Sequence, residues 1–581
     1  MILSALNDYY IRMVGDPDAS MPKPGFSEEK ISFAIMIDEA GTFKRVIDLR
    51  EVSGKKVGPK RMIVPAAEKR SGTSVVPNFL WDNSGYVLCL DGKGKPERTQ
   101  TTFESFRKKH QEVAAASKSP RIRAVASFLD AWSSEKAEQL DLKEELLDQN
   151  IVFWMEGDDV PLHENPEVIS VWKGRQGSGE ADGYSAPCLV TGEVQPIARL
   201  HPPIKGVVGG QPAGCAIVSF NLDAFLSYGK EQSFNAPVSK HVAFAYTTAL
   251  NYLLRRENKR SLLIGDSSTV FWAEKKTPAE DLLSVMFDLS NEPEEENSEE
   301  GPGEDVQTAR KVRSLLRALC DGRPSEAPMG DLDPDVRFFV LGLAPNQSRI
   351  SVRFWCRSTF GELAQKISTH YAALRIERQY QNQPEFPALW QILLETAAQQ
   401  KRENIPPMLS GALSRSVLTG SRYPESLYAA VIGRIRADKQ VNYIRAAIIK
   451  ACLIRNHPDK AGEMTMALNS DRKDVPYLLG RLFSLLEKVQ SDALGKIGTS
   501  IRHRYFSSAS ATPSIVFPQL LRLAQHHIAK AEYGGNMDRK IQAVVEDIDD
   551  FPARLSLQDQ GVFTIGYYHQ ANANYRKTEK E

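Results

Sequence analysis

Arginines placed next to aromatic residues are the first chemistry that the sequence suggests. Residues 501–508 (IRHRYFSS) carry Arg502 and Arg504 directly before a tyrosine and a phenylalanine. Guanidinium groups bind backbone phosphates and aromatic rings stack on unpaired bases, so this mixture suits a single-stranded nucleic acid. The alternative is a helix end whose aromatic rings lie in a hydrophobic core, and the sequence alone favours neither interpretation.

A second basic segment lies at 424–456, where few acidic residues accompany Arg434, Arg436, Lys439, Arg445, Lys450 and Arg455. Arg434 and Arg445 are about three helical turns apart and would share a face if one continuous helix carried both. Residues 306–581 hold 38 Lys+Arg against 27 Asp+Glu, although the net charge of the whole chain is zero. Such asymmetry indicates a half that faces nucleic acid, but solvated helix faces would produce the same surplus.

The stretch KGVVGGQPAG at 205–214 invites comparison with phosphate-binding loops. It lacks the Gly-Lys-Ser/Thr ending of the Walker motif, and its glycines do not match the dinucleotide-binding pattern. Two interpretations therefore remain. The stretch is either a set of structural turns or a loop whose bare backbone approaches a ligand such as DNA.

No motif for catalysis, metal or cofactor binding stands out. The six cysteines are far apart without a Cys-x-x-Cys pair, which argues against a disulfide framework and a zinc site. No His-Glu-x-x-His, Gly-x-Ser-x-Gly or paired-carboxylate motif is evident either. We expect a non-catalytic protein with no cofactor. The alternatives are a metal-dependent nuclease and a helical scaffold that only bridges protein partners.

The location that we expect is the cytoplasm. No run approaches about 18 consecutive apolar residues, so no membrane-spanning helix is predicted. The opening MILSALNDYYIRM lacks the basic and apolar regions of a signal peptide. Isolated cysteines fit reduced thiols.

The first part of the chain reads as a mixture of helices and strands. Helices are predicted at 1–14 and 121–132. Apolar runs at 31–37 and 43–49, separated by Asp38, Glu39 and Gly41, predict a hairpin, and further strands are expected at 86–90 and 213–220. The clearest hairpin is 336–343 with 349–356, turning at Pro345-Asn346, and we expect it to rejoin the N-terminal sheet.

That pairing would make 291–335 an insertion rather than a domain boundary. Within it, the acidic run 291–305 (NEPEEENSEEGPGED) contains no large apolar residue, so we predict a disordered linker or inserted loop.

From residue 358 onward the pattern is helical, with predicted helices at 360–380, 386–400, 424–437, 440–456, 475–490, 516–532 and 538–548. Proline residues separate them, which is typical of a helical bundle with short loops. The predicted fold class is therefore α+β. A mixed α/β domain with an antiparallel sheet spans 1–357, and an all-α helical bundle spans 358–581.

Several long strings are distinctive: MILSALNDYYIRM (1–13), FLWDNSGYVL (79–88), the segment at 188–214, VSFNLDAFLSYGKEQSFNAPVS (218–239), IGDSSTVFWAE (264–274), VRFFVLGLAPNQSRISVRFW (336–355) and ATPSIVFPQLLRLAQHHIAK (511–530). The sequence in these strings, and almost to residue 570, resembles the large subunit of the type I-C CRISPR surveillance complex, Cascade.

The resemblance implies a non-catalytic subunit at the crRNA 5′ end. It would inspect duplex DNA for a protospacer-adjacent motif, separate the strands and hold the displaced strand on its C-terminal helices, while guide pairing reads the sequence. The implied partners are crRNA, double-stranded target DNA, the displaced single strand, the backbone, handle-binding and small subunits of Cascade, and a recruited helicase–nuclease. No membrane partner is implied.

For the implied motif-reading role, the first candidates lie around SFNAPVS: Gln232, Ser233, Asn235, Ser239 and Lys240. Amide side chains suit adenine edges or minor-groove acceptors, and lysine suits phosphate. The second candidates are Lys205 and Gln211, with Gln211 as a strand-separating wedge. Asn235 has the alternative of a capping or turn residue before Pro237.

A third, weaker group consists of Lys69, Arg70 and Asn78. For the displaced strand the candidates are Arg434, Arg445, Arg502 and Arg504. The resemblance also implies that about 464–581 is similar to a free small subunit that is also made by internal translation initiation. Met464 and Met466 are the candidate internal starts.

Overall fold

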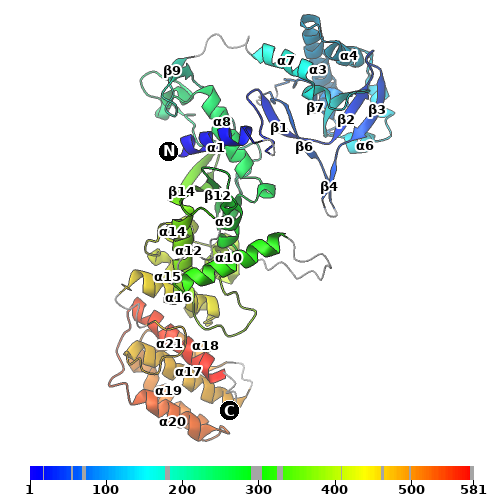
Figure 1. The fold of residues 1–581 in the computed structure, drawn as a ribbon. Coiled ribbons are helices and arrows are strands. Elements are labelled where there is room, and N and C mark those ends of the chain that lie inside the picture. Colours follow the sequence, from blue (N-terminus) through cyan, green and yellow to red (C-terminus); the bar gives the residue numbers. More distant parts are fainter. Residues whose placement is uncertain are drawn as a thin grey trace. The chain divides into compact units, whose positions relative to one another are not determined.

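The computed structural model describes residues 1–16, 19–53, 56–68, 74–176, 184–289, 304–322, 332–406, 408–458, 464–495 and 499–575. The protein is α+β, as predicted, with two four-stranded sheets and three two-stranded ribbons in this part of the chain (Figure 1). Two compact units are present. Unit 1 contains Leu3–Pro202 and Val218–Leu250, and unit 2 contains Pro203–Ile217 and Asn251–Glu581.

The sheet of unit 1 has the order β3-β2-β8-β7, with β2 (Phe33–Ile37), β3 (Phe43–Asp48), β7 (Trp81–Asn83) and β8 (Asn150–Met155). The predicted β2–β3 hairpin is confirmed. The sheet is mixed rather than purely antiparallel, because β2 and β8 run parallel after a helical crossover. The strand predicted at 86–90 is wrong: Asn83 ends β7 and caps the short helix α2 (Ser84–Val87).

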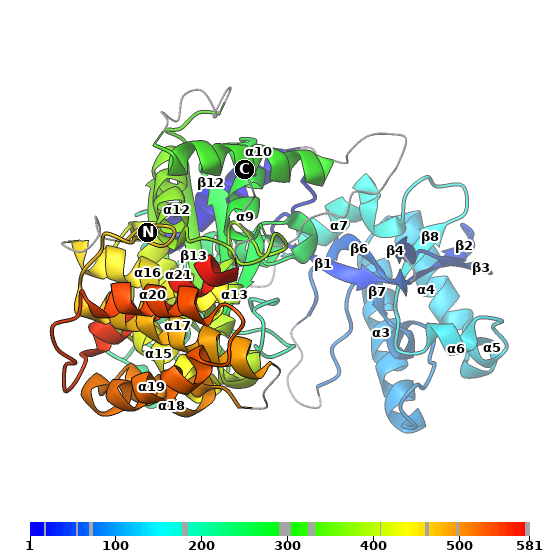
Figure 2. The ribbon, with the colours of Figure 1, turned by 90° about the horizontal axis from the view of Figure 1, so that it is seen from below.

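Both faces of this sheet are covered, which explains why β2 is apolar throughout. Alternate residues such as Phe33 and Phe153 share a buried cluster with α3 (Pro96–Ala116) and α4 (Pro120–Ala131). Ala34 and Val152 point to the opposite face, which the ribbon of β1 (Phe26–Ile31) and β6 (Lys60–Pro65) covers. Figure 2 shows α3 and α4 beside the sheet.

The remainder of unit 1 brings its first helix, α1 (Ile2–Val14), against α8 (Lys240–Leu253). Tyr10 of α1 packs edge-on against Phe244 of α8, with ring centroids 5.9 Å apart. The long segment before α8 contains the short ribbon of β9 (Ser185–Pro187) and β10 (Val194–Pro196) and two short 3-10 helices, Asp223–Phe225 and Gln232–Asn235. Backbone hydrogen bonds tie this segment to the start of α8, including that from Ala198 N to Val238 O.

The sheet of unit 2 is antiparallel and has the order β11-β12-β13-β14, with β11 (Ser261–Ile264), β12 (Ser267–Ala273), β13 (Arg337–Asn346) and β14 (Arg349–Thr359). The predicted β13–β14 hairpin is confirmed, but it pairs with β12 and not with the N-terminal sheet. The strand predicted at 213–220 is reduced to isolated bridges at Cys215 and Ala216.

Because β12 and β13 are neighbours, the residues between them are inserted in the sheet of unit 2, whereas the predicted insertion at 291–335 assumed pairing with the N-terminal sheet. The described part of this insertion contains α9 (Ala279–Phe287) and α10 (Glu304–Cys320), and sequence reasoning missed α10. The acidic loop was predicted at 291–305, and its residues 291–303 lie outside the described part of the chain.

The helices of unit 2 after the sheet are α12 (Phe360–Leu374), α13 (Leu389–Leu394), α14 (Leu409–Thr419), α15 (Glu425–Asp438), α16 (Tyr443–Asn456), α17 (Val475–Leu494), α18 (Ile501–Ala509), α19 (Pro513–Ile528), α20 (Gly534–Val545) and α21 (Leu557–Tyr575). Each of the seven predicted helices has a counterpart, but the one predicted at 386–400 is reduced to α13, and α14 and α21 were not predicted. One buried cluster extends from Ile264 in β11 to Tyr568 in α21. The predicted domain boundary at 357/358 falls inside β14, where this core is continuous.

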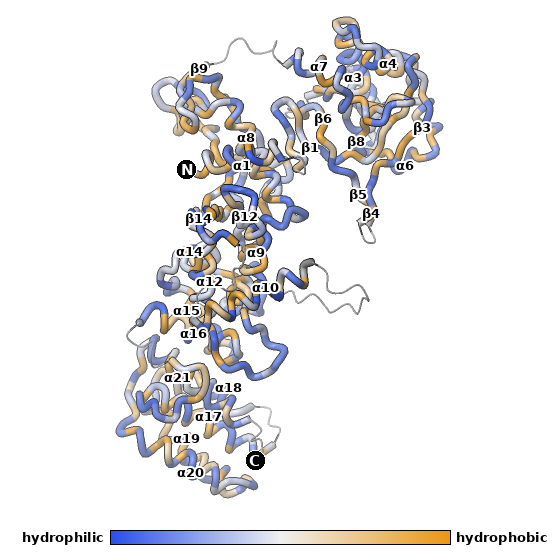
Figure 3. Tube along the Cα trace, viewed as in Figure 1, coloured by the Kyte–Doolittle hydropathy of each residue, from blue (hydrophilic) through white to orange (hydrophobic). Residues whose placement is uncertain are grey.

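Hydrophobic and hydrophilic residues alternate along these helices (Figure 3), as expected for helices that bury one face. In the described part of the chain, no helix combines the length and hydropathy needed to span a bilayer.

Helices α17 and α21 approach so closely that glycine is required on both. A Cβ atom added at Gly480 would lie 2.0 Å from Phe563 O, and one added at Gly566 would lie 2.2 Å from Tyr477 O. These are backbone atoms of the opposing helix, so no side-chain rotation relieves the overlap. The two helices are therefore in direct backbone contact.

We expect Gly566→Ala to lower the free energy of unfolding by about 2–3 kcal/mol, because the added methyl group forces the two helices apart. The matched control is Gly433→Ala on α15, where an added Cβ meets nothing within 4 Å. That change should leave stability unchanged or raise it by up to about 1 kcal/mol. Urea unfolding followed by circular dichroism measures both, and equal effects would contradict the close-contact interpretation.

Candidate nucleic-acid interface

The glycine-rich loop of unit 2 is built from consecutive hydrogen-bonded turns. Ile204 and Cys215 close its base through reciprocal backbone hydrogen bonds of 2.8 and 2.9 Å. Within the loop, Gly210 N donates to Val207 O and Gly214 N donates to Gln211 O. The stretch therefore contains a set of structural turns, and these turns are compatible with both interpretations of the loop.

Glycine is needed at specific points of this loop. Gly206, Gly209 and Gly214 have φ angles of 96°, 78° and 97°, in the left-handed region that other residues rarely adopt. A Cβ atom at Gly214 would also lie 2.7 Å from the Cβ atom of Pro203. Substituting these glycines would disturb the turns that shape the loop.

The loop is fastened to the rest of unit 2 while its polar side chains remain exposed. Val208 N donates to Ser268 Oγ of β12 at 3.0 Å, and Asn251 Oδ1 accepts from Lys205 N at 2.7 Å. Lys205 and Gln211 are both exposed. The structure therefore holds these two predicted residues at an ordered, solvent-accessible loop.

In unit 1, Asn235 has a structural role. Its Oδ1 accepts from Ser227 N at 2.9 Å, while its Nδ2 donates to Lys230 O at 2.8 Å and to Gln232 O at 2.9 Å. Both ends of the carboxamide are therefore used to close the 227–235 loop. We correct the proposed base contact and assign Asn235 to the turn.

Ser233 and Ser239 are also removed from the interface, because each is only 1% exposed. Ser239 Oγ accepts from Val242 N and so caps the first turn of α8. Its own N–H donates to the Cys188 thiol at 3.3 Å. Burial acts to raise the pKa of that thiol, but the surrounding backbone N–H groups outweigh this effect and lower the pKa to about 7.

Gln232 and Lys240 keep the features needed for ligand contact. Gln232 has a φ of 45°, and its buried Oε1 has no hydrogen-bond partner in the described structure. Such an unsatisfied acceptor on a strained residue is typical of a functional position. Lys240 is exposed at the first position of α8.

The loop that Asn235 closes also exposes apolar residues that sequence reasoning missed. Tyr228 is 96% exposed with a φ of 52°, and Leu222 is exposed nearby in sequence. Exposed aromatic side chains on a strained loop can stack on or insert between bases. The signal was present in LDAFLSYG, where apolar residues lie among turn-forming residues.

Of the third group of candidates, Asn78 lies in the described part of the chain. Asn78 is 3% exposed, its Oδ1 accepts from Glu68 N, and its own N–H donates to Asp82. It therefore organises a buried turn and leaves the interface. Lys69 and Arg70 lie outside the described residues.

Arg445 is a structural residue of unit 2. It is 2% exposed, its Nε lies 2.7 Å from Glu395, and its Nη2 lies 2.6 Å from Asp438. Arg434 pairs with the same Asp438. The two arginines lie on separate helices, as the predicted helices at 424–437 and 440–456 require, because Lys439 ends α15 with a φ of 56°. We therefore remove Arg445 from the displaced-strand surface.

In helix α18, some residues of the 501–508 segment pack in the core and others remain accessible to a nucleic acid. Phe506 is buried and packs edge-on against Phe483, so this aromatic ring belongs to the core. Arg502 is half-buried beside Glu487. Arg504 is exposed, so it is the more accessible of the two cations.

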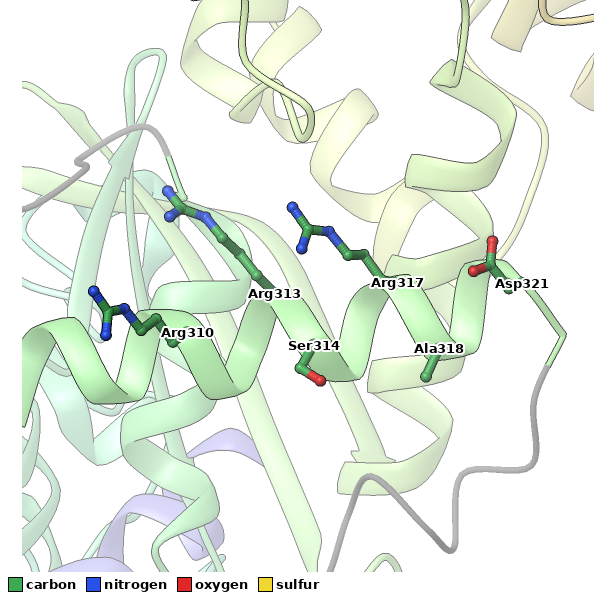
Figure 4. Close-up of a pocket in the computed structure, with 6 residues that line it drawn as sticks. All are labelled: Arg310, Arg313, Ser314, Arg317, Ala318 and Asp321. Atoms are coloured by element: carbon green, nitrogen blue, oxygen red, sulfur yellow. The ribbon is translucent and has the colours of Figure 1, made fainter.

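Helix α10 carries a row of arginines that sequence reasoning overlooked. Arg310, Arg313 and Arg317 extend from one side of the helix and line a cavity of about 490 Å³ (Figure 4). Arg317 forms a bidentate ion pair with Glu385. The spacing of three and four residues was the available signal. Arg313 Nη2 donates to Leu289 O at 3.3 Å, so the guanidinium groups of Arg313 and Arg317 are both engaged within the protein.

The described residues contain no group of three or more His, Cys, Asp or Glu side chains arranged to hold a metal ion. A comparison with protein families adds a decisive observation: the model of "CRISPR-associated protein (Cas_Csd1)" matches residues 6–575. The chain belongs to the Cas_Csd1 family. This is a family of Cascade large subunits, which places the Cas_Csd1 chain in the CRISPR defence system. No curated protein matches the sequence.

The buried ion pair yields a test of the Arg445 assignment. Arg445→Ala should lower the free energy of unfolding by about 3–5 kcal/mol, because it leaves Glu395 buried without its partner. Arg504→Ala should change stability by less than about 0.5 kcal/mol, since its side chain is exposed. Denaturant unfolding compares them, and a stable Arg445→Ala protein would return Arg445 to the candidate interface.

Proposed function

We propose that the chain is a non-catalytic large subunit that reads a short DNA motif beside the target, helps to separate the strands and holds the displaced strand. The observation that carries this proposal is the glycine-rich loop. It is ordered by turns and fastened to β12, yet it exposes Lys205 and Gln211. Membership of a Cascade large-subunit family supplies the context.

The chemistry of the loop fits duplex entry. Gln211 presents a carboxamide, which can donate to and accept from base edges, and Lys205 presents a cation suited to phosphate. The glycines leave the backbone bare, so the loop can approach a groove closely. In unit 1, Gln232 and Lys240 offer the same pair of side-chain types.

The displaced strand needs a surface that binds phosphates without reading sequence. Arg504 is exposed on α18, whereas Arg502 of the same helix is half-buried beside Glu487. Such contacts weaken with salt because binding releases counterions. Sequence reading would be left to guide pairing, and strand cleavage to a recruited helicase–nuclease.

The subunit-level test compares crRNA-loaded complexes assembled with and without this chain. We expect discrimination between targets with correct and scrambled adjacent motifs to disappear without the chain. Within complete complexes, Gln211→Ala should reduce discrimination between the two kinds of target by about 1–3 kcal/mol. Lys205→Ala should instead weaken the binding of all targets to the same extent.

Lys401→Ala, an exposed cation elsewhere in unit 2, is the matched control. Gel-shift titration measures all three variants. Discrimination that survives without the chain would overturn the proposal and favour the scaffold alternative.

We also propose that residues from about 464 are made separately as a small-subunit-like fragment. In the full chain, α21 packs on α15, where Tyr428 OH donates to the carbonyl oxygen atoms of Leu557 and Gln558. A fragment without α15 would uncover this face of α21, so we expect it to be stable only when a partner covers it.

An antibody against the C-terminus should detect a band of about 13 kDa in cells that express the gene. Met464→Leu combined with Met466→Leu should abolish that band and preserve the full-length chain, because leucine conserves apolar volume at the buried Met464. The absence of the band from wild-type cells would refute internal initiation.

A further inference from the structure

Unit 1 exposes a group of large apolar side chains that the proposed function does not use. They lie on the loop 221–229, in which every residue is exposed. Leu222 is 57% exposed, Phe225 and Leu226 are 38% and 39% exposed, and Tyr228 is 96% exposed. Isolated apolar residues are common on protein surfaces, but a contiguous group of this kind marks an interaction site.

Hydrogen bonds hold this loop in one conformation. Asn235 bonds to the backbone at Ser227, Lys230 and Gln232 through both ends of its carboxamide. Lys230 N also donates to Ser227 O at 3.0 Å, and Asp223–Phe225 form a short 3-10 helix. The loop therefore presents its apolar side chains already ordered, so a partner that binds them does not have to order the loop.

The β9–β10 ribbon adds further exposed apolar side chains. Leu189 N donates to Pro237 O at 2.8 Å, so the ribbon lies beside the chain that follows the loop. Leu189 is 60% exposed and Val194 is 70% exposed. We call the exposed side chains of these two segments the apolar patch, which consists of Leu189, Val194, Leu222, Phe225, Leu226 and Tyr228.

The charges around the apolar patch favour a protein partner over a nucleic acid. Within the loop 221–229 the charged side chain is that of Asp223, and Glu231 is exposed just after the loop. Lys230, which lies between them in sequence, is half-buried. The ribbon and its end contribute one exposed acid and one exposed base, Glu193 and Arg199. A nucleic-acid surface needs a surplus of cations for the phosphates, and this patch has none.

We infer that the apolar patch docks on another protein subunit of the same complex, at an apolar pocket whose rim is basic. Membership of a Cascade large-subunit family places the chain in a multi-subunit assembly, which supplies a permanent partner to cover the patch. Binding energy at protein interfaces is concentrated in a few side chains, and tyrosine is among the most frequent of them. Tyr228 is therefore expected to be the main anchor. The inference goes beyond motif reading, because this contact forms without DNA.

The test measures assembly in the absence of DNA. Full-length chain is titrated into crRNA-loaded complex that lacks it, and biolayer interferometry gives the dissociation constant. We expect Tyr228→Ala and Leu222→Ala each to weaken binding at least tenfold, because each change removes an apolar anchor. Asp223→Lys should weaken binding more than Asp223→Asn, since a lysine would face the basic rim of the pocket.

Tyr533→Ala is the matched control, because Tyr533 is 71% exposed but belongs to unit 2. It should leave the dissociation constant unchanged. Thermal unfolding followed by circular dichroism should give the same midpoint for all these variants and the wild type, since the altered side chains are exposed. Wild-type affinity of both Tyr228→Ala and Leu222→Ala would overturn the inference.

A crosslinker on the patch identifies the class of partner. The native cysteines are buried or half-buried, so Leu226→Cys provides an accessible thiol for a benzophenone maleimide. In the complex assembled on target DNA at saturating concentration, this label should couple to a protein subunit. Coupling to crRNA or DNA would overturn the inference and assign the patch to nucleic acid. Gln211→Ala complexes should assemble normally, so a failure of the proposed motif reading is distinguishable from a failure of docking.

Discussion

The backbone contact between α17 and α21 is the constraint on which the helical part of the chain depends. Because Gly480 and Gly566 remove side chains from the contact, the two helices lie close enough for an aromatic cluster to form beside them. Phe483 of α17 and Phe563 of α21 meet in this cluster, and Phe506 brings in α18. The helices that carry the exposed arginines are therefore positioned by two glycines far apart in the sequence.

The same contact shapes a polar cavity of about 720 Å³, which is lined by segment 377–380, α17, the start of α18 and the last turns of α21. Helix α17 contributes Glu487 and Lys488 to its wall, and α21 contributes Tyr567 and Asn572. One face of each helix thus packs into the core while another face lines the cavity. A change in the spacing of the two helices would alter both, so stability and the shape of the cavity are expected to be coupled here.

Positive charge in unit 2 is divided between structure and surface. Arg445 uses its charge internally, between Glu395 and Asp438, where desolvation makes an unpaired partner costly. Arg504 keeps its charge in solvent, where it remains available to phosphates. The surplus of basic residues in the second half of the sequence therefore overstates the charge that a nucleic acid could meet.

Local patterns allowed much of the fold to be predicted from sequence. The β13–β14 hairpin and the seven helices were predicted because a few neighbouring residues determine periodicity, caps and turns. The strand that pairs with this hairpin, β12, was not predicted, because it lies more than 60 residues earlier. The predicted surface role of Arg445 was wrong for the same reason, because the burial of its side chain depends on Glu395, 50 residues away.

The candidate site shows the same division between local and distant causes. The turns of the glycine-rich loop could be expected from the glycines themselves, and Asn235 before Ala236-Pro237 was already a turn candidate. The polar cavity could not be expected, because its walls come from segment 377–380, α17, the start of α18 and the last turns of α21, which are far apart in the sequence. Side chains that are brought together from distant segments leave no local pattern in the sequence, whereas loops built from turn-forming residues do.

The order of the glycine-rich loop matters physically for the proposed strand separation. Opening a duplex costs stacking energy, and a loop that also lost conformational freedom on insertion would add to that cost. Hydrogen-bonded turns and the anchor at Ser268 impose this loss during folding, before DNA arrives. Gln211 would then meet the duplex already positioned, so binding free energy could be directed to separating the strands rather than to ordering the loop.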